Sequence, residues 1–224
     1  MLKIVQSRSL LLLAACALAV AGCGKSKEEA AASLLTDSSG LLRYVPADTP
    51  YVFGSLAPPP DEFLDRIEPK VDRLLAAYSE MLGVVMAEAQ SEGGDAEELE
   101  KYDALVTEVR SLLSLEGLNE AGLTRDSTGL LYGNGLLPVL RVTLSDASLF
   151  DDFITRIEAK AGEQLAVGEV EGLPYRFIED EGVRIIIATA DDQFVLTVAP
   201  DSLDDAALAR LLGLDLPAEN IAQT

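Results

Sequence analysis

The spacing of apolar residues predicts two long helices in the first half of the chain. From residue 61, apolar side chains recur three or four positions apart, as on one face of an α-helix: Phe63, Leu64, Ile67, Val71, Leu74, Leu75, Tyr78, Leu82, Val85 and Met86. The same spacing returns at Leu99, Tyr102, Leu105, Val106, Val109, Leu112 and Leu113. The polar run 91–95 separates the two stretches, so we predict a helical hairpin over residues 61–115. Pro69 has no amide N–H and is expected to kink or split the first helix after Ile67.

Alternating and β-branched runs predict strands on both sides of the hairpin. Residues 51–56 have strand composition, and residues 130–132 and 136–144 flank Gly133-Asn134-Gly135, a hairpin signal. Pro138 places its strand at a sheet edge or marks the strand's start. Four further strands, at about 164–170, 174–179, 183–190 and 193–199, predict an antiparallel meander with turns at Glu171-Gly172, Glu181-Gly182 and Asp191-Asp192.

Capping signals predict two shorter helices. Ser145 or Asp146 caps a helix that ends at Gly162 and turns inward Leu149, Phe150, Phe153, Ile154 and Ile157. A last helix over 202–212 is capped by Asp201 or Ser202, whereas 117–127 is expected to be a connector. The pattern as a whole predicts an α+β fold, with an antiparallel strand meander packed with the helical hairpin and further helices.

One stretch of sequence echoes another. Residues 61–71 read DEFLDRIEPKV and residues 151–161 read DDFITRIEAKA, with six of eleven positions identical at an offset of 90. Each follows a strand that begins at a proline, Pro50 or Pro138. We interpret the echo as two copies of a strand-then-helix unit; the alternative is chance between amphipathic helices of similar composition. Duplication predicts that Phe63 and Phe153 occupy equivalent core positions.

The first 23 residues have the three parts of a secretion signal. Residues 1–9 carry Lys3 and Arg8 and no acid, and an apolar run of 11 residues follows at 10–20. As a helix this run is ~16 Å long, too short for a hydrocarbon core of ~30 Å. Its length and flanks are typical of a secretory signal. The segment ends in Val20-Ala21-Gly22-Cys23, which resembles the bacterial lipobox of an aliphatic residue, two small residues and cysteine.

The resemblance to the lipobox implies that Cys23 is the lipidation site. In that family the thiol takes a diacylglyceryl group, a peptidase cuts before the cysteine, and the new amine usually takes a fatty acid such as palmitate. Residues 1–22 are then a removed signal peptide, 23–40 the lipidated cysteine and tether, and 41–224 a single α+β domain. The alternative is an ordinary signal with an A-x-A-like site at Ala19 and Ala21. Gly24 in place of Asp implies, by the enterobacterial sorting rule, the outer membrane, facing the periplasm.

Two further segments carry a second resemblance. YVPADTPYVF, residues 44–53, and LYGNGLLPVLRV, residues 131–142, look like a group of uncharacterised secreted or lipid-anchored proteins of Gram-negative bacteria. The resemblance covers most of residues 41–160. Proteins of that group are considerably longer, which implies that this chain is the N-terminal part of a longer protein. The group implies a location and no chemistry.

Composition narrows the range of partners and reactions. The chain has 38 acids against 17 bases, a net charge of −21, which repels phosphate backbones and predicts no nucleic-acid partner. It has no histidine, the commonest general base and metal ligand, and we assign no catalytic residue, metal or cofactor. Asp126-Ser127-Thr128-Gly129 is one residue away from the D-[ST]-G motif of aspartic proteases, but it has no second copy and is interpreted as a turn.

The sequence leaves three functions open. The first is a non-enzymatic binding or assembly module, attached to the membrane by acyl chains, whose protein partner contacts the hairpin 61–115. The second is a hydrolase that uses paired carboxylates, and the third a carrier of an apolar ligand between helices and sheet. The candidate pairs are Asp151-Asp152, Glu179-Asp180-Glu181, Asp191-Asp192 and Asp204-Asp205. Acids are also expected at such turns and helix starts for capping and solubility.

Overall fold

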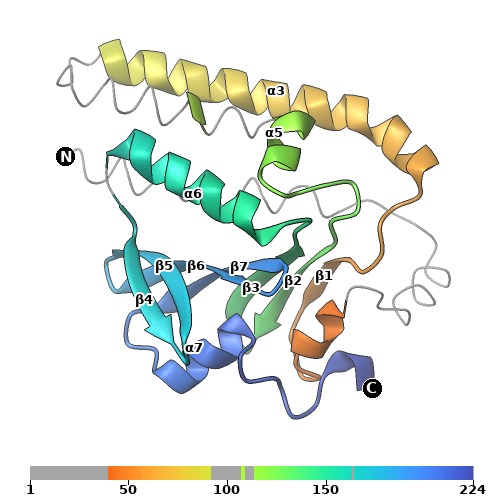
Figure 1. Ribbon diagram of the computed structural model, residues 1–224, viewed down its shortest axis with the longest axis vertical. Helices are drawn as coiled ribbons and strands as arrows, with labels where there is room; N and C mark the ends of the chain where they lie inside the picture. Colours follow the sequence, from red (N-terminus) through yellow and green to blue (C-terminus); the bar gives the residue numbers. More distant parts are fainter. Residues whose placement is uncertain (1–39, 92–106, 109–113, 163, 224) are drawn as a thin grey trace. The chain divides into compact units, whose positions relative to one another are not determined.

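The computed structural model describes residues 40–91, 107–108, 114–162 and 164–223 of the chain (Figure 1). These residues divide into two compact units that alternate along the sequence. The sheet unit contains residues 40–57, 128–143 and 167–223, and the helical unit contains the described parts of 58–127 and 144–166. Strands and helices segregate, so the predicted α+β class is confirmed. That residues 41–224 form a single domain stays a prediction.

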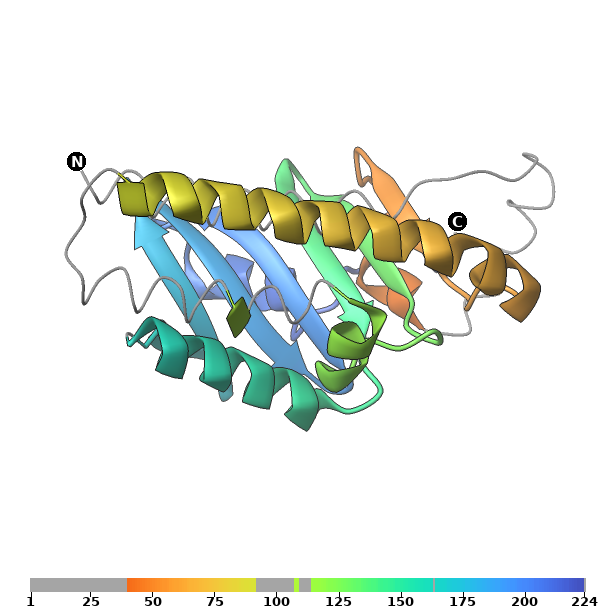
Figure 2. The ribbon, with the colours of Figure 1, turned by 90° about the horizontal axis from the view of Figure 1, so that it is seen from above.

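In the described residues, seven strands form one antiparallel sheet. They are β1 (Val52–Ser55), β2 (Gly129–Asn134), β3 (Leu137–Thr143), β4 (Ala166–Val170), β5 (Leu173–Asp180), β6 (Val183–Ala190) and β7 (Gln193–Pro200). Their spatial order is β1-β2-β3-β7-β6-β5-β4, with β1 and β4 at opposite ends (Figure 2). The predicted β2–β3 hairpin and the predicted meander of the last four strands are both confirmed.

Turn residues set the register of the meander. The backbone is left-handed at Glu171 (φ 50°), Glu181 (φ 48°) and Asp191 (φ 53°), at the three predicted turns. Two-residue turns of this kind match the right-handed twist of the strands they join. The β2–β3 turn lies slightly later than predicted, because Asn134 is still paired with Leu137 and the turn residues are Gly135 and Leu136.

Pro138 does not mark an edge strand. It is the second residue of β3, which lies between β2 and β7, so the edge prediction is wrong and the prediction of a strand start is correct. Near a strand end, the missing amide N–H costs the sheet little. The Pro138 carbonyl still accepts a hydrogen bond of 2.8 Å from the Thr197 hydroxyl of β7.

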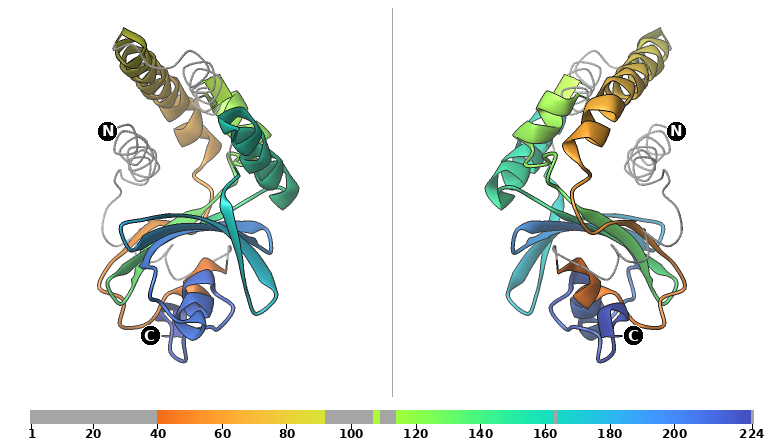
Figure 3. Two further views of the ribbon diagram at one scale, coloured as in Figure 1. Left: turned by 90° about the vertical axis from the view of Figure 1, so that its left-hand side faces the viewer. Right: turned by 90° about the vertical axis from the view of Figure 1, so that its right-hand side faces the viewer.

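One face of the sheet packs against three short helices. These are η2 (Leu41–Tyr44), α7 (Asp205–Leu212) and η3 (Ile221–Gln223), and all three lie on the same side of the sheet (Figure 3). Alternate residues of β7 point into this core, where Val195, Thr197 and Ala199 are buried. The core is completed mainly by Leu41, Val45, Leu130, Tyr132, Val139, Ile186, Leu208, Leu211 and Leu212.

Helix α7 begins later than predicted. Its N-cap is Asp204, whose carboxylate accepts a hydrogen bond of 2.8 Å from the Ala207 amide. The predicted caps Asp201 and Ser202 form a turn instead. The tail after α7 pairs with the segment after η2: the Ala47 amide donates to the Glu219 carbonyl, and the Ile221 amide to the Val45 carbonyl.

The helical unit contains α3 (Asp61–Ser91), α5 (Leu115–Glu120) and α6 (Ala147–Ala161). Helix α3 confirms the first predicted helix and is continuous through Pro69, so the predicted split is wrong. Pro69 and Asp65 are both exposed, which leaves the carbonyl freed by the proline open to water. The second predicted helix lies outside the described residues, apart from helical residues 107–108.

A short helix occupies part of the predicted connector. Helix α5 is capped by the Ser114 hydroxyl, which accepts a hydrogen bond of 3.0 Å from the Gly117 amide. Gly117 lies inside the helix and is a poor helix former, which is why the sequence pattern favoured a loop here.

Helix α6 agrees with its predicted ends. Asp146 is the N-cap and accepts from the Ser148 amide at 2.9 Å, and Gly162 ends the helix in the left-handed conformation. Of the residues predicted to point inward, Phe150, Phe153 and Ile154 are buried and Ile157 is half-buried. The prediction is wrong for Leu149, which is 37% exposed.

The two similar stretches, 61–71 and 151–161, do not share the same pattern of buried residues. Both echoing stretches are helical and both follow a strand, as predicted. However, residues 61–71 begin α3, whereas residues 151–161 form the later part of α6. Phe153 is buried and Phe63 is exposed, so the predicted equivalence of these two positions is wrong. Duplication itself stays a prediction.

Phe153 provides a test of packing in the helical unit. Its side chain is 4% exposed, so Phe153→Ala is expected to lower the free energy of unfolding by about 3–5 kcal/mol through lost burial and a residual cavity. The measurement is chemical denaturation of the purified protein. Leu149→Ala, on the exposed side of the same helix, is the matched control and is expected to cost about 1 kcal/mol or less. Equal losses for the two variants would contradict the packing described here.

Candidate functional site

The predicted lipidation site lies outside the described residues. Cys23 belongs to the segment 1–39, so its acylation stays a prediction. Within the described ranges, no helix is both long enough and apolar enough to cross a membrane.

The paired acids lie at turns, at a helix cap and on a helix. Residues 179–181 and 191–192 are exposed at the ends of strands, and Glu179 forms an ion pair of 2.7 Å with Arg184. The exposed pair Asp204-Asp205 starts α7, and Asp151-Asp152 lies on α6 with Asp152 exposed. These positions serve turn formation, capping and ion pairing. Across the part of the chain that the structure describes, no group of three or more His, Cys, Asp or Glu side chains is placed to hold a metal ion.

The segment resembling an aspartic-protease motif forms the predicted turn. The Ser127 amide donates to the Thr124 carbonyl at 3.0 Å, and the Ser127 hydroxyl accepts from the Thr124 amide at 3.0 Å. Thr128 is buried, and its amide donates to the Thr143 hydroxyl at 2.8 Å. These bonds join the start of β2 to the end of β3 and leave the motif with a structural role.

The most unusual chemistry of the sheet unit is a buried cation. Arg141 of β3 is 1% exposed and is the one charged side chain among the buried residues of the described ranges. Its guanidinium donates to the Leu212 carbonyl at 2.8 Å and to Gln193 Oε1 at 3.1 Å. Both of these acceptors are neutral oxygen atoms, whereas a buried cation is usually paired with a carboxylate.

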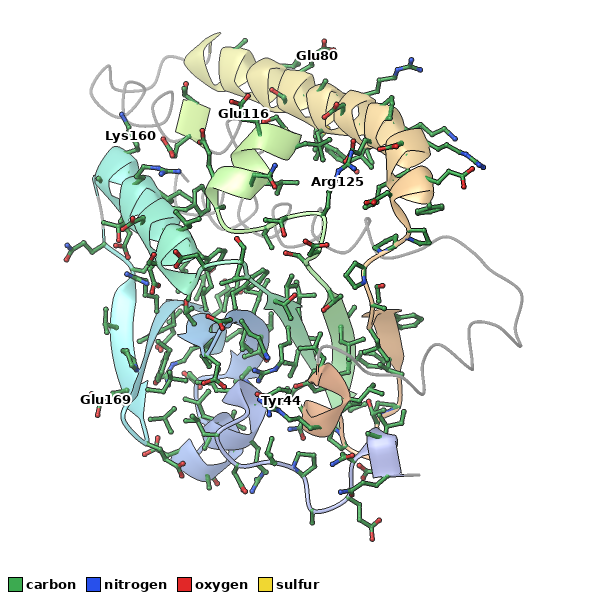
Figure 4. All side chains as sticks on the ribbon, turned by 45° about the vertical axis from the view of Figure 1, so that its right-hand side comes forward. Tyr44, Glu80, Glu116, Arg125, Lys160 and Glu169 are labelled. Atoms are coloured by element: carbon green, nitrogen blue, oxygen red, sulfur yellow. The ribbon has the colours of Figure 1, made fainter. Side chains whose placement is uncertain are left out.

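Two further features stabilise this charge. Leu212 is the last residue of α7, so its carbonyl lies at the negative end of the helix dipole. The guanidinium carbon also lies 3.8 Å from the ring centroid of Tyr44, a cation–π geometry (Figure 4 labels Tyr44). Gly213 leaves room for the arrangement, because a Cβ there would lie 2.4 Å from Arg141 Nη2. The cluster therefore joins β3, β7, α7 and η2.

A buried phenol lies beside the cluster. The Tyr132 hydroxyl is buried and meets no partner at hydrogen-bond geometry. Burial raises the pKa of Tyr132 above its ordinary 10.0, and the nearby positive charge of Arg141 opposes part of that shift. The phenol therefore stays neutral at physiological pH, and a guanidinium does not exchange protons there. We assign the cluster a structural role.

Sequence reasoning missed Arg141, although the strand carries a signal for it. Val139 and Arg141 are two residues apart on β3, so they point to the same face of the sheet. Val139 is buried, so the alternation of the strand directs the Arg141 side chain toward the core as well. The α7 carbonyl and the Tyr44 ring that accommodate the charge come from distant parts of the chain.

Replacement of Arg141 tests this role. Arg141→Ala is expected to lower the free energy of unfolding by about 3 kcal/mol or more, since it leaves the buried Leu212 and Gln193 oxygens unpaired and removes packing on Tyr44. The matched control is Arg43→Ala, because Arg43 also lies over the Tyr44 ring but is half exposed. Its loss is expected to be below about 1 kcal/mol. A small effect of Arg141→Ala in chemical denaturation would refute the proposed role.

The raised pKa of Tyr132 predicts a loss of stability in alkali. Above about pH 10 the unfolded chain releases the phenol proton while the folded chain retains it, so the unfolded state binds fewer protons and folding stability falls as pH rises. Tyr132→Phe is expected to reduce this loss and to be neutral or stabilising at pH ~7, since it removes an unpaired hydroxyl. The measurement is the free energy of unfolding at about pH 7, 9 and 11. An unchanged alkaline slope in the variant would contradict it.

Among the described residues of the helical unit, most of the exposed large apolar side chains lie on α3. Phe63, Leu74, Met81 and Val84 are all exposed, and these are four large apolar side chains on a single helix. Leu75, on another side of α3, is buried. The helix therefore has a buried position on one side and a separate strip of exposed apolar side chains.

A network of ion pairs holds another side of α3. Arg125, in the loop after α5, pairs with Asp65 at 3.2 Å and with Glu68 at shorter range. The hydrogen bond that Arg125 donates to the Glu68 carboxylate raises the pKa of Arg125 above its ordinary value. Figure 4 shows Arg125 beneath α3 and Glu80 projecting from the helix away from it. These ion pairs connect the loop after α5 to α3.

Comparison with protein-family models, with curated proteins and with solved structures gives no match for this chain. The resemblances to lipobox proteins and to the longer envelope proteins therefore remain predictions from the sequence.

Proposed function

We propose that the protein is a lipid-anchored protein of the bacterial cell envelope, attached through acyl chains on Cys23 and facing the periplasm, with the outer membrane as its expected location. Its folded part acts as a non-enzymatic binding or assembly module. The observation on which this depends is the N-terminal order of basic residues, an 11-residue apolar run and Val20-Ala21-Gly22-Cys23. Two or three acyl chains hold a protein at a membrane essentially permanently, whereas one chain does so marginally.

The charge of the chain supports attachment by lipid rather than by charge. Cleavage before Cys23 removes two of the 17 bases and none of the 38 acids, so the mature chain is more acidic than the precursor. Anionic lipid head groups repel such a surface. The acidity also keeps the domain soluble beside the membrane.

The described geometry supports binding more than catalysis. The acidic pairs at residues 179–181, 191–192 and 204–205 are exposed at turns and a cap, where acids commonly serve capping and solubility. The exposed strip of α3 offers a protein partner apolar surface that a monomer would otherwise leave in water. We therefore place the partner surface on α3, within the predicted contact region 61–115.

Replacement of Cys23 tests the anchor. Cys23→Ser is expected to leave unprocessed precursor and to abolish incorporation of a radioactive fatty acid, because the acceptor thiol is lost. The measurement combines labelling in cells with the intact mass of the purified protein, whose first residue is expected to be Cys23 with added acyl mass.

Cys16 provides the matched control, since it lies inside the apolar run that is removed with the signal. Cys16→Ser is expected to leave labelling and processing unchanged. Retained labelling in Cys23→Ser, or a mature N-terminus other than residue 23, would exclude lipidation at this cysteine.

A further inference from the structure

The exposed strip of α3 has the spacing of a coiled-coil seam. Ile67, Leu74 and Met81 are seven residues apart, and so are Phe63, Lys70, Ala77 and Val84. The two rows alternate at spacings of three and four residues over about three heptads, the pattern of two helices packed side by side. All of these residues except the half-buried Ile67 are exposed, and Val84 is 67% exposed.

Both basic and acidic residues lie along the outer margin of this seam. Arg66, Arg73 and Glu80 each directly precede a residue of the first row, and all three are exposed. The helix also exposes Glu62, Asp65 and Asp72, which disfavour an anionic membrane surface as the occupant. A partner that suits this strip has an apolar seam of the same spacing and carries acid and base at corresponding positions.

We infer that the strip pairs with the α3 helix of a second copy of this chain, in an antiparallel arrangement. One register packs Ile67 against Val84 of the second copy, Leu74 against Ala77, and Lys70 against Met81, each twice by the two-fold symmetry. The aliphatic stem of Lys70 covers Met81, while its ammonium group reaches water at the margin. In the same register Arg73 of each copy lies beside Glu80 of the other.

Charge selects this register over its neighbours. A shift by one heptad places Arg66 beside Glu80 of the second copy, twice, but it also brings Arg73 beside Arg73, a repulsive contact that the proposed register lacks. A parallel pair at equal register stacks Lys70 on Lys70 in the seam, which buries two like charges. The antiparallel pair avoids both contacts. This inference rests on the proposed role of α3 as the contact surface, but not on the lipid anchor.

Cysteine crosslinking in the cell envelope tests the arrangement. In the full chain carrying Ile67→Cys and Val84→Cys, the two positions are 17 residues apart, about 25 Å along the helix, so they cannot join within one copy. Across the proposed pair they are opposite each other, and mild oxidation is expected to give covalent dimers on a non-reducing gel. Either single variant is expected to give none. Dimers from a single variant, or none from the double variant, would overturn the proposal.

The parent chain separates this result from the lipid anchor. With Cys23 acylated, it has no free thiol after signal removal and is expected to give no covalent dimer. A dimer from the parent would count against lipidation alone, and the crosslinking test would then be made in a Cys23→Ser background.

A charge exchange at two residues beside the seam gives a separate test of the register. In the doubly substituted crosslinking chain, Glu80→Lys and Arg73→Glu are each expected to lower the dimer yield about fivefold, since each places like charges together twice. The combination Arg73→Glu with Glu80→Lys is expected to restore it. The matched control is Asp72→Lys, on the far side of α3, which makes the same charge change and relieves the general repulsion between two acidic chains. Equal yields for Glu80→Lys and Asp72→Lys would refute the register.

Discussion

The sheet unit depends on burying a guanidinium group without a carboxylate beside it. Arg141 is buried in the folded sheet unit, and its guanidinium contacts the end of α7, Gln193 and the ring of Tyr44. A buried cation that lacked these contacts would cost several kcal/mol. The packing of β3, of β7 and of the helices below them is therefore coupled, because each supplies part of the environment of one side chain. Gly213 belongs to the same arrangement through the space that it leaves.

The elements that could be predicted from sequence are those specified by local chemistry. Turns at Glu171, Glu181 and Asp191, the Asp146 cap and the stop at Gly162 follow from residues next to one another in the chain, and all are confirmed. The errors have a common cause in longer-range context. Pro69 was expected to kink or split a helix that is continuous through it. Gly117 favoured a connector where a short helix forms, and Asp201 or Ser202 was predicted as the cap where Asp204 serves.

The same division applies to the candidate site. Helical periodicity located α3, but periodicity alone does not say which apolar positions are covered, so the exposure of Phe63 and Leu149 was not foreseen. The alternation of side chains along β3 predicts which face of the sheet Arg141 is on. The α7 carbonyl and the Tyr44 ring reach Arg141 only in the folded chain, so these partners could not be predicted. The predicted lipobox is different, because the resemblance implies a motif that enzymes recognise in an extended segment, without any folded structure. It remains the strongest functional signal in the chain and lies outside the described residues.

The segment between β1 and β2, which contains α3 and α5, can change in length or sequence without changing the sheet. The chain leaves the sheet at Ser55 and returns at Gly129, and these two residues are register partners in the β1–β2 pair. The whole intervening stretch is thus topologically the loop of a hairpin. Loop-closure entropy grows only slowly with length. Insertions or deletions there can lengthen or trim the helices, or exchange them for another module, while the strand pairing on either side stays the same.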